Sequence, residues 1–352
     1  MSRFVYAGIA GGLLLVLLVV SPGSSAEEAW SRPVTDSAGA IVIETVMLED
    51  EDQDPAAAGR RVAEALLAAM KGVAPKVVLV SESFEDEENK AALLEGIHAV
   101  IDPALVVGLS TYGSFTQAGC TDFDAVCLLG IGGEGIGVSA ALVTEMGAAR
   151  LSLEDQEALL AERLGAAGQA LAERLARGAQ DRLAVVLADA HSPKNRFLVE
   201  GMQRVLAPEF AITGGSANRN AGQTFVYFAG EMHEDAAVAL MLSGDFAVSL
   251  AGRLAMDHEG IIRTAGEAAG EARRATVGEP FAVLAFNCAG RRGRVDRMED
   301  ELEAIQSALG RELPLFGCYC AGEVGPLDPA ERVEGVFSGG SGWHVIFTVF
   351  SR

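Results

Sequence analysis

Three loops of the sequence place short polar side chains beside glycines, and each loop directly follows an apolar run. The loops are residues 108–113, 214–219 and 317–323. Glycine loops at the carboxyl ends of parallel strands are where α/β proteins usually bind ligands, through backbone N–H groups and neighbouring polar side chains. Glycines that only form tight turns are the alternative. The recurrence of the loop three times favours a shared pocket. Its polar side chains are Ser110, Thr111, Ser216, Asn218, Tyr319 and Glu323.

Other motifs that would indicate catalysis or a metal site are incomplete or lie in the wrong structural context. Residues 130–135 match G-x-G-x-x-G, but strand-like sequence lies on both sides, whereas a dinucleotide site needs a helix after the loop. The serines at 110 and 341 lie between glycines without forming G-x-S-x-G. No two of the five histidines are spaced i,i+4, and there is no C-x-x-C. We therefore expect no enzyme, and a hydrolase with a Cys or Ser nucleophile is the least favoured alternative.

The five cysteines leave at least one thiol unpaired. Cys318 and Cys320 fall on the same side of an extended chain, and Cys288 ends the apolar run before them. A disulfide between Cys288 and one of these two is one interpretation, and a free thiol facing the ligand is the other. Cys127 and Cys288 also fit small buried hydrophobic residues.

The elements that must position these loops repeat along the chain. Each of three segments shows an apolar run, a helical stretch, a second apolar run, the glycine loop and two or more further strands. Val77 precedes Gly108 by 31 residues and Leu183 precedes Gly214 by 31, while Ala282 precedes Gly317 by 35. One such unit cannot cover its own apolar faces, so the three should pack together. A capped helix is predicted over 153–177, between the first two segments.

The repeat predicts an α/β fold. A strand–helix–strand start implies a right-handed parallel crossover, and the hairpins that follow add antiparallel strands. We expect mixed β-sheets built from three strand–helix–strand–hairpin units, with helices on the outer faces. A four-layer αββα sandwich is the alternative.

Composition and charge exclude some partners. Half of the residues are hydrophobic but only 6% are aromatic, which is typical of a packed α/β core. The net charge of −22 disfavours nucleic acid. Acidic runs at 49–54 and 82–88 are interpreted as solvated loops or helix starts and are assigned no site.

The N-terminus has the layout of a secretory signal. Arg3 precedes an uncharged run over 4–20, and the small residues Ser24, Ser25 and Ala26 follow. We expect residues 1–26 to be a signal peptide cleaved before Glu27, which places the protein in the periplasm or outside the cell. An uncleaved membrane anchor is the alternative, because the apolar run is long.

Several motifs resemble those of one family. The stretch 317–326, G-C-Y-C-A-G-E-V-G-P, resembles the G-F-Y-S-x-G-E-I-x-P signature of FIST C-terminal domains, and 288–291 is similar to their C-x-x-R. The loops at 108–113 and 214–217 look like the G-C-T-T-A-G-E loop and the G-G-x-A turn of FIST N-terminal domains. The resemblance implies a FIST N-terminal-like domain at 76–260 and a shortened C-terminal-like domain at 261–352, after a strand–helix extension at 27–75.

The resemblance also implies a function. FIST domains are regarded as input modules of signal transduction that bind small ligands such as amino acids, and some members bind haem and respond to nitric oxide. It adds Cys288 and Arg291 to the predicted pocket, with Arg291 pairing a ligand carboxylate and Glu323 holding an ammonium group. A structural salt bridge between these two is the alternative.

These residues contain no output module, so we expect a membrane-bound signalling partner. For a haem-based gas sensor, the other function considered, the available axial ligands are His191, His233, His258 and His344. Oligomeric state is not predicted.

Overall fold

The repeat in the sequence corresponds to three structural units with the same order of elements. The structure is a computed structural model, and it describes residues 28–220 and 222–352. Each unit runs β–α–β–α–β, continues into a short hairpin, and ends in a long strand. A short strand, β1 (Ala29–Arg32), precedes the first unit.

Bounds of the elements are as follows. Unit 1 contains β2 (Val42–Glu49), α1 (Pro55–Ala69), β3 (Pro75–Glu82), α2 (Glu87–His98), β4 (Val106–Ser110), β5 (Ser114–Thr116), β6 (Gly119–Thr121) and β7 (Ala125–Gly132). Unit 2 contains β8 (Ile136–Val143), α3 (Leu153–Arg174), β9 (Asp181–Ala188), α4 (Asn195–Leu206), β10 (Ile212–Ser216), β11 (Val226–Phe228), β12 (Glu231–His233) and β13 (Ala237–Gly244). Unit 3 contains β14 (Ala247–Leu254), α5 (His258–Arg274), β15 (Pro280–Cys288), α6 (Ala289–Arg292), α7 (Met298–Leu309), β16 (Leu315–Cys320), β17 (Glu323–Gly325), β18 (Gly339–Ser341) and β19 (His344–Ser351).

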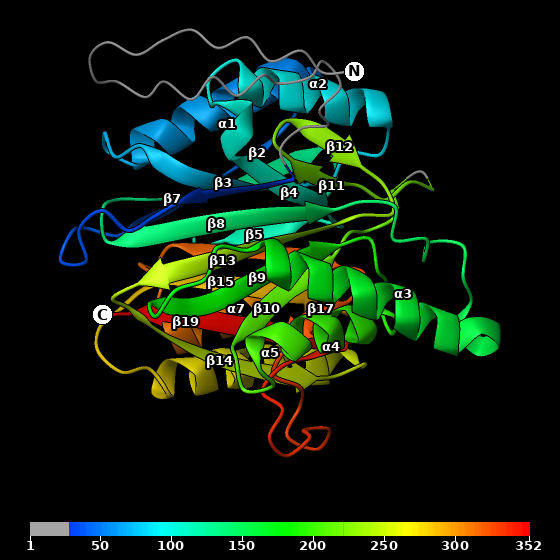
Figure 1. The fold of residues 1–352 in the computed structure, drawn as a ribbon. Helices are drawn as coiled ribbons and strands as arrows, with labels where there is room; N and C mark the ends of the chain where they lie inside the picture. The colour runs from blue at the N-terminus through cyan, green and yellow to red at the C-terminus, as the bar shows by residue number, and fades with distance from the viewer. Residues whose placement is uncertain (1–27, 221) are drawn as a thin grey trace, which may run out of the picture.

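Within each unit, four strands form a mixed sheet in the same order. The orders are β2-β7-β3-β4, β8-β13-β9-β10 and β14-β19-β15-β16. The last two strands of each are the parallel pair that the sequence predicts, joined across a helix. Helices cover the outer faces, with α1 and α2 over the sheet of unit 1 and α3 and α4 over that of unit 2 (Figure 1). The prediction of an α/β fold with mixed sheets and outer helices is confirmed.

The hairpin that follows each parallel pair leaves its own unit and extends the sheet of another. Strand β5 pairs with β16 of unit 3, β11 pairs with β4 of unit 1, and β17 pairs with β10 of unit 2. Each unit therefore gives one hairpin and receives one, in a closed cycle. The sheets contain seven, six and six strands once these hairpins and β1 are added. This exchange ties the three units into one body.

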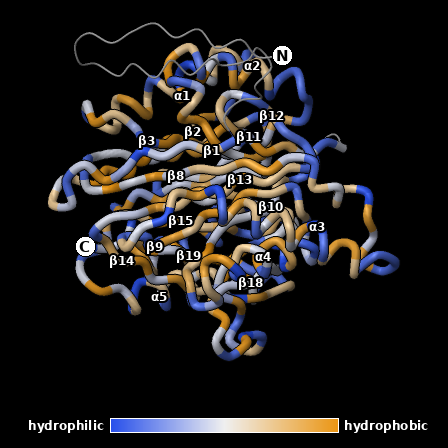
Figure 2. Tube along the Cα trace, in the orientation of Figure 1, coloured by the Kyte–Doolittle hydropathy of each residue, from blue (hydrophilic) through white to orange (hydrophobic). Residues whose placement is uncertain are grey.

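One apolar core lies between the three sheets. It combines inward-facing side chains of all units, such as Leu79, Leu187 and Phe286, which are buried. Smaller clusters lie between each sheet and its own helices. In Figure 2 hydrophobic stretches run through the stacked strands, while hydrophilic residues gather in the outer loops.

The glycines that begin the predicted loops occupy one equivalent position in the three sheets. Gly108, Gly214 and Gly317 lie opposite Val80, Val186 and Ala285 of the parallel partner strands. The position tolerates no side chain. A Cβ on Gly214 would lie 1.9 Å from the Val186 carbonyl oxygen, and one on Gly317 would lie 2.1 Å from the Phe115 ring.

Two elements differ from the sequence prediction. The repeat predicts two or more further strands after the first glycine loop, but β8, the second long strand after that loop, belongs to the sheet of unit 2. The stretch before Phe281 contains the 17-residue helix α5, which the sequence analysis did not identify. Its buried face is largely alanine, as at Ala265, Ala268 and Ala272, so the helix is weakly hydrophobic on average although its apolar residues are regularly spaced.

Candidate functional site

The three predicted loops meet, and backbone hydrogen bonds join them in a cycle. The N–H of each loop donates to the carbonyl at the end of a parallel strand in another unit, and a second set of three bonds runs alongside. The first set is Asn218 N to Ser110 O (2.8 Å), Ala321 N to Ser216 O (2.9 Å) and Tyr112 N to Tyr319 O (2.8 Å). The second is Ser110 N to Phe225 O (3.0 Å), Ser216 N to Gly322 O (2.8 Å) and Tyr319 N to Gly113 O (3.0 Å). These N–H groups, which the sequence analysis assigned to a ligand, are therefore used to join the units.

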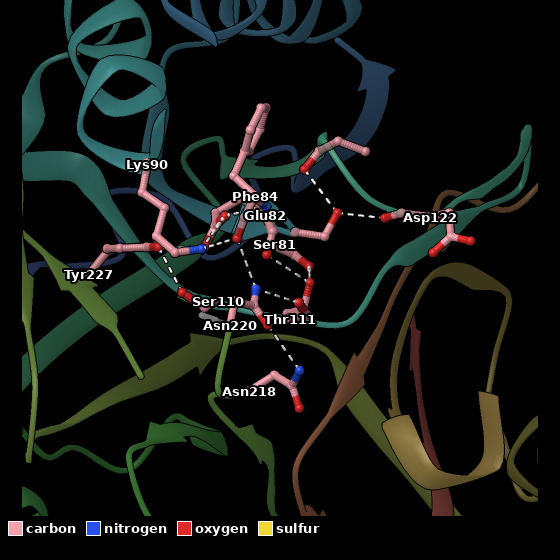
Figure 3. A network of polar contacts seen from close by, with 12 residues as sticks. Ser81, Glu82, Phe84, Lys90, Ser110, Thr111, Asp122, Asn218, Asn220 and Tyr227 are labelled. Carbon is pink, nitrogen blue, oxygen red and sulfur yellow. Dashed lines mark hydrogen bonds and ion pairs between the residues drawn. The ribbon is translucent and has the colours of Figure 1, made fainter. Parts of the chain in front are cut away.

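In unit 1 the predicted residue Ser110 belongs to a sealed polar network (Figure 3). Its hydroxyl lies 3.0 Å from the Tyr227 hydroxyl, which in turn donates to Glu82. Glu82 forms an ion pair of 3.1 Å with Lys90, and both side chains are 0% exposed. Since Tyr227 comes from the hairpin of unit 2, the network crosses the boundary between the units. The side chains of this network are all buried.

Thr111 lies in a second group of buried hydroxyls beside this network. Its hydroxyl is 2.9 Å from that of Ser81, which is 2.7 Å from Ser114. The Asn220 amide donates to the Thr111 and Phe84 carbonyls at 3.1 and 3.0 Å, as Figure 3 shows. All these groups satisfy one another, so they position the loop.

In unit 3 the predicted residues Arg291 and Tyr319 share a buried network with Glu301. Arg291 is 0% exposed, and its guanidinium donates to Glu301, Asn287, Thr264 and the Ile261 carbonyl at 2.9–3.1 Å. The Tyr319 hydroxyl donates to the other Glu301 oxygen at 3.0 Å. The salt-bridge partner of Arg291 is thus Glu301, where the sequence analysis had considered Glu323. Protein groups already accept from each guanidinium nitrogen that a ligand carboxylate would use.

Glu323 is buried beside Cys288 and His344. Its Oε2 accepts from the His344 N–H at 3.0 Å, whereas Oε1 has no hydrogen-bond partner among the described residues. Burial raises the pKa of Glu323 to about 8, although the His344 N–H, the Cys288 thiol and the charge of Arg291 oppose the rise. Burial also raises the pKa of Cys288 to about 12.

The cysteines form no disulfide in this structure. All five are free, and only Cys120 is not buried. The sulfur atoms of Cys318 and Cys320 lie 3.6 Å apart on the same side of β16, as the spacing predicts. Cys288 lies opposite Cys320 in the β15–β16 register without a bond between the two sulfur atoms, and its own sulfur accepts a hydrogen bond from the Trp343 N–H. The thiols therefore belong to the core.

At the equivalent positions, unit 2 lacks the buried charged side chains of the other two units. Lys90 and Glu301 are each the fourth residue of the helix in their crossover, and the fourth residue of α4 is the buried Leu198. At the strand position of Glu82 and Asn287, unit 2 has Ala188. Its polar groups lie further along the chain, in the loops after β9 and β10.

An open cleft of about 640 Å³ lies beside the loops that follow β9 and β10 of unit 2. Its volume is within the size range of small-molecule sites. Three arginines line it from the loop before α3, from α3 and from the loop after β10: Arg150, Arg163 and Arg219. Among the described residues, no hydrogen-bond acceptor or ion-pair partner is found for Arg150 or Arg219. In a chain with 49 acidic and 27 basic residues, three arginines at one cleft are a local concentration of basic side chains.

Three acidic residues also line the cleft: Asp189, Glu234 and Asp235. Asp235 accepts from the N–H groups of Gly147, Ala148 and Ala149 at 2.6, 3.1 and 3.3 Å, so it fixes the loop before α3. Asp189, only 7% exposed, directly follows β9 and accepts from the Asp235 N–H at 2.9 Å. Thus the cleft has cationic side chains near its rim and a carboxylate within it.

Two of the predicted residues are close in sequence to residues that line this cleft. Asn218 immediately precedes Arg219, and the Ser216 hydroxyl donates to the Ala190 carbonyl at 2.7 Å. The predictions of Asn218 and Ser216 as ligand-binding residues remain untested. Arg219 and Asp189 were not among the predicted site residues. Asp189 directly follows the apolar run of β9, and Arg219 is the last residue of the glycine loop at 214–219.

The histidines proposed as haem ligands lie on separate elements. His191 is the one near the cleft, where burial lowers its pKa, the carboxylate of Asp189 raises it and the charge of Arg219 lowers it. His344 is buried and accepts from the Asp328 N–H at 3.1 Å. Within residues 28–220 and 222–352, no three His, Cys, Asp or Glu side chains gather as a metal site. Haem binding stays a prediction.

The predicted signal segment, 1–26, lies outside the described residues. Across the part of the chain that the structure describes, no helix is both long and apolar enough to cross a membrane.

The comparison with known families gives a match over more than half of the chain. The sequence model described as the FIST N domain matches residues 76–269. The matched range includes all of unit 2, with the cleft, and most of unit 1. No curated protein matches the sequence.

Solved structures match at low identity. A cyanuric acid hydrolase from A. caulinodans is 9% identical with a TM-score of 0.42, over 89% of this chain and 100% of that chain. A second cyanuric acid hydrolase structure is 11% identical with a TM-score of 0.40, over 89% and 99%. PurLQS from Thermotoga maritima is 10% identical with a TM-score of 0.26, over 90% and 73%. These values are too low to bear on function.

Proposed function

Since this chain belongs to the FIST family, we propose that it is a sensory input protein whose unit 2 cleft binds a small carboxylate, such as an amino acid. The observation that carries the proposal is the pair of arginines, Arg150 and Arg219, that face one cleft without protein partners. A guanidinium holds a carboxylate through two parallel hydrogen bonds. Such a site is selective because the planar fork matches the planar ligand group.

An amino acid would satisfy both sides of the cleft. Its carboxylate would pair with Arg219, and its ammonium group would face Asp189, whose carboxylate is held in place by the Asp235 N–H. Arg219 and Asp189 thereby take the roles that the sequence analysis gave to Arg291 and Glu323. A ligand without the ammonium group would leave the Asp189 carboxylate without a cationic partner. The site should therefore bind zwitterions more tightly than simple carboxylates.

The lining of the cleft supports binding over catalysis. Among the described residues it includes no Ser and no Cys, and its single hydroxyl is that of Thr224. His191 and Asp189 lie in the same neighbourhood, but no hydrogen bond joins the Thr224 hydroxyl to either of them, so a nucleophile activated by this pair is not assembled among the described residues. We propose that the protein reports its ligand to a membrane-bound signalling partner.

We also propose that the protein works outside the cytoplasm. The support is the sequence of the first 26 residues: Arg3, an uncharged apolar run and Ser24-Ser25-Ala26. Mass spectrometry of the protein from the periplasmic fraction is expected to show a chain that begins at Glu27. Recovery of the uncleaved chain from the cytosolic fraction would contradict this location.

Replacing Arg219 with Ala is expected to weaken ligand binding by about 10- to 100-fold, the value of one charged hydrogen-bonded contact. Ligands are first found by the rise in Tm that amino acids and other small carboxylates cause, and affinities are then measured by calorimetry. Arg219→Lys keeps the positive charge but loses the planar guanidinium that forms two parallel hydrogen bonds, so it should retain only part of the affinity.

The matched control is Arg263→Ala, which removes an exposed arginine that pairs with Glu267 on α5. It should bind as tightly as the wild type. Equal affinities for the wild type and Arg219→Ala, with a ligand that clearly raises Tm, would show that the cleft is not the site.

A further inference from the structure

The two acidic runs that the sequence analysis left without a role meet at one place in unit 1. The first lies between β2 and α1, and the second leads into α2. Between them is a polar pocket of about 260 Å³, near the carboxyl end of β3. It is lined by Asp50, Gln53, Asn89 and Asp124, together with Pro55 and Phe84.

Asp50 is the unusual member of this group. The residue is 6% exposed, and its Oδ1 accepts from the Asp54 N–H at 3.1 Å. Its Oδ2 is buried and has no hydrogen-bond partner among the described residues, which also provide no Lys or Arg that forms an ion pair with Asp50. A buried carboxylate without a counter-charge is costly, so a cation is the missing partner that this position calls for.

Three of the other lining side chains, those of Gln53, Asn89 and Asp124, carry oxygen atoms that could bind a cation. The Asp50 N–H donates to the Asp124 carbonyl at 2.8 Å, which ties the end of β2 to the turn before β7. The Asp124 N–H donates to the Ser83 carbonyl at 3.2 Å, at the end of β3. The pocket is therefore framed by backbone contacts that do not depend on its side chains.

We propose that this pocket binds a calcium ion. The carboxylates of Asp50 and Asp124 and the amide oxygens of Gln53 and Asn89 would supply oxygen ligands, with water completing the shell. Calcium accepts six to eight oxygen ligands in irregular arrangements that mix carboxylate, amide and water, which this set matches. Magnesium requires a near-ideal octahedron of short bonds, and zinc prefers His and Cys, which are not among the lining residues.

Calcium would join four segments of unit 1: the end of β2, the start of α1, the first turn of α2 and the turn before β7. With two carboxylates, the affinity should fall in the weak range of extracellular calcium modules, with a Kd of about 10⁻⁴–10⁻³ M. The site is remote in the chain from the unit 2 cleft, so it does not depend on the function proposed there.

The test is thermal unfolding of the full chain in metal-free buffer, with calcium chloride added. Calcium is expected to raise Tm by about 2–4 °C at concentrations well above Kd, while magnesium chloride at the same concentration raises it much less. Calorimetric titration with calcium chloride should show one binding event per chain.

Asp50→Asn keeps the size of the side chain and removes the charge, so it should abolish the calcium response. The matched control is Asp52→Asn in the same run, which removes an exposed carboxylate paired with Arg61 and should respond like the wild type. If Asp50→Asn fails to fold, Asp124→Asn, an exposed position, should weaken calcium binding at least 10-fold by calorimetry. An undiminished calcium response in these pocket variants, or equal shifts with calcium and magnesium, would overturn the proposal.

Discussion

Replacing Lys90 with Met is expected to lower the free energy of unfolding by about 3–5 kcal/mol, the usual cost of removing one partner of a buried ion pair. Lys90 and Glu82 are both fully buried, and their atoms lie 3.1 Å apart. Without the ammonium group, Glu82 keeps the donors of Tyr227 and of the Phe84 N–H but loses its counter-charge. Because Tyr227 belongs to the hairpin exchanged from unit 2, the loss weakens a junction between units.

Chemical denaturation followed by circular dichroism measures the effect. The double variant Glu82→Gln with Lys90→Met removes both charges and should regain much of the lost stability, since no charge is then left buried alone. Arg263→Met, which breaks an exposed pair on α5, should cost less than about 1 kcal/mol. A Lys90→Met protein as stable as this surface control would show that the pair is not a structural element.

Replacing Glu323 with Gln is expected to stabilise the protein in alkaline solution and to change little in acid. The pKa of Glu323 is raised from 4.5 to about 8 in the folded protein. At low pH the carboxyl is neutral in both states, so burial costs nothing. As pH rises from about 4.5 to about 8, the unfolded chain ionises first, and stability is lost progressively through this window. At about 1.4 kcal/mol for each tenfold change, the difference reaches about 4–5 kcal/mol.

Other groups near Glu323 do not titrate in that window in a way that would mimic this result. The pKa of Cys288 is raised to about 12, and burial lowers the pKa of His344 below its usual value of 6.5. Unfolding curves of the wild type and of Glu323→Gln should thus coincide near pH 4.5 and separate by pH 9. Parallel curves across the whole range would mean that Glu323 is ionised in the fold.

The repeat of the fold was predictable because it rests on local patterns. Apolar runs, crossover helices and glycines recur at similar spacing, and Gly108, Gly214 and Gly317 do occupy equivalent positions. The cap of α3 at Ser152 was equally visible, since its hydroxyl accepts from the N–H groups of Glu154 and Asp155. Signals of this kind depend on residues close together in the chain.

The exchange of hairpins was not predictable from these patterns. Strands of three residues, such as β5, β11 and β17, have too little periodicity to show which sheet they join. Their pairing uses the loop N–H groups, so it also decides whether those groups can bind a ligand. Where the sequence predicts a shared pocket, a ring of backbone hydrogen bonds joins the three loops, and the open cleft of unit 2 is lined by residues next to one of them.

The roles of individual charges depend on contacts between distant residues. Arg291 follows a strand end as a ligand-binding arginine would, but the Glu301 that satisfies it lies on α7 and the Thr264 beside it on α5. Arg219 lies in a similar loop, but among the described residues no hydrogen bond or ion pair is found for its side chain. Sequence position alone could not distinguish the two arginines.

A crystal structure with a bound ligand would test the central claim most directly. The ligand would be the amino acid or small carboxylate that raises Tm most. We predict electron density for its carboxylate at Arg219 and for its ammonium group at Asp189, in the unit 2 cleft. Density at the unit 3 loops beside Arg291 and Glu323, with the unit 2 cleft empty, would contradict the account.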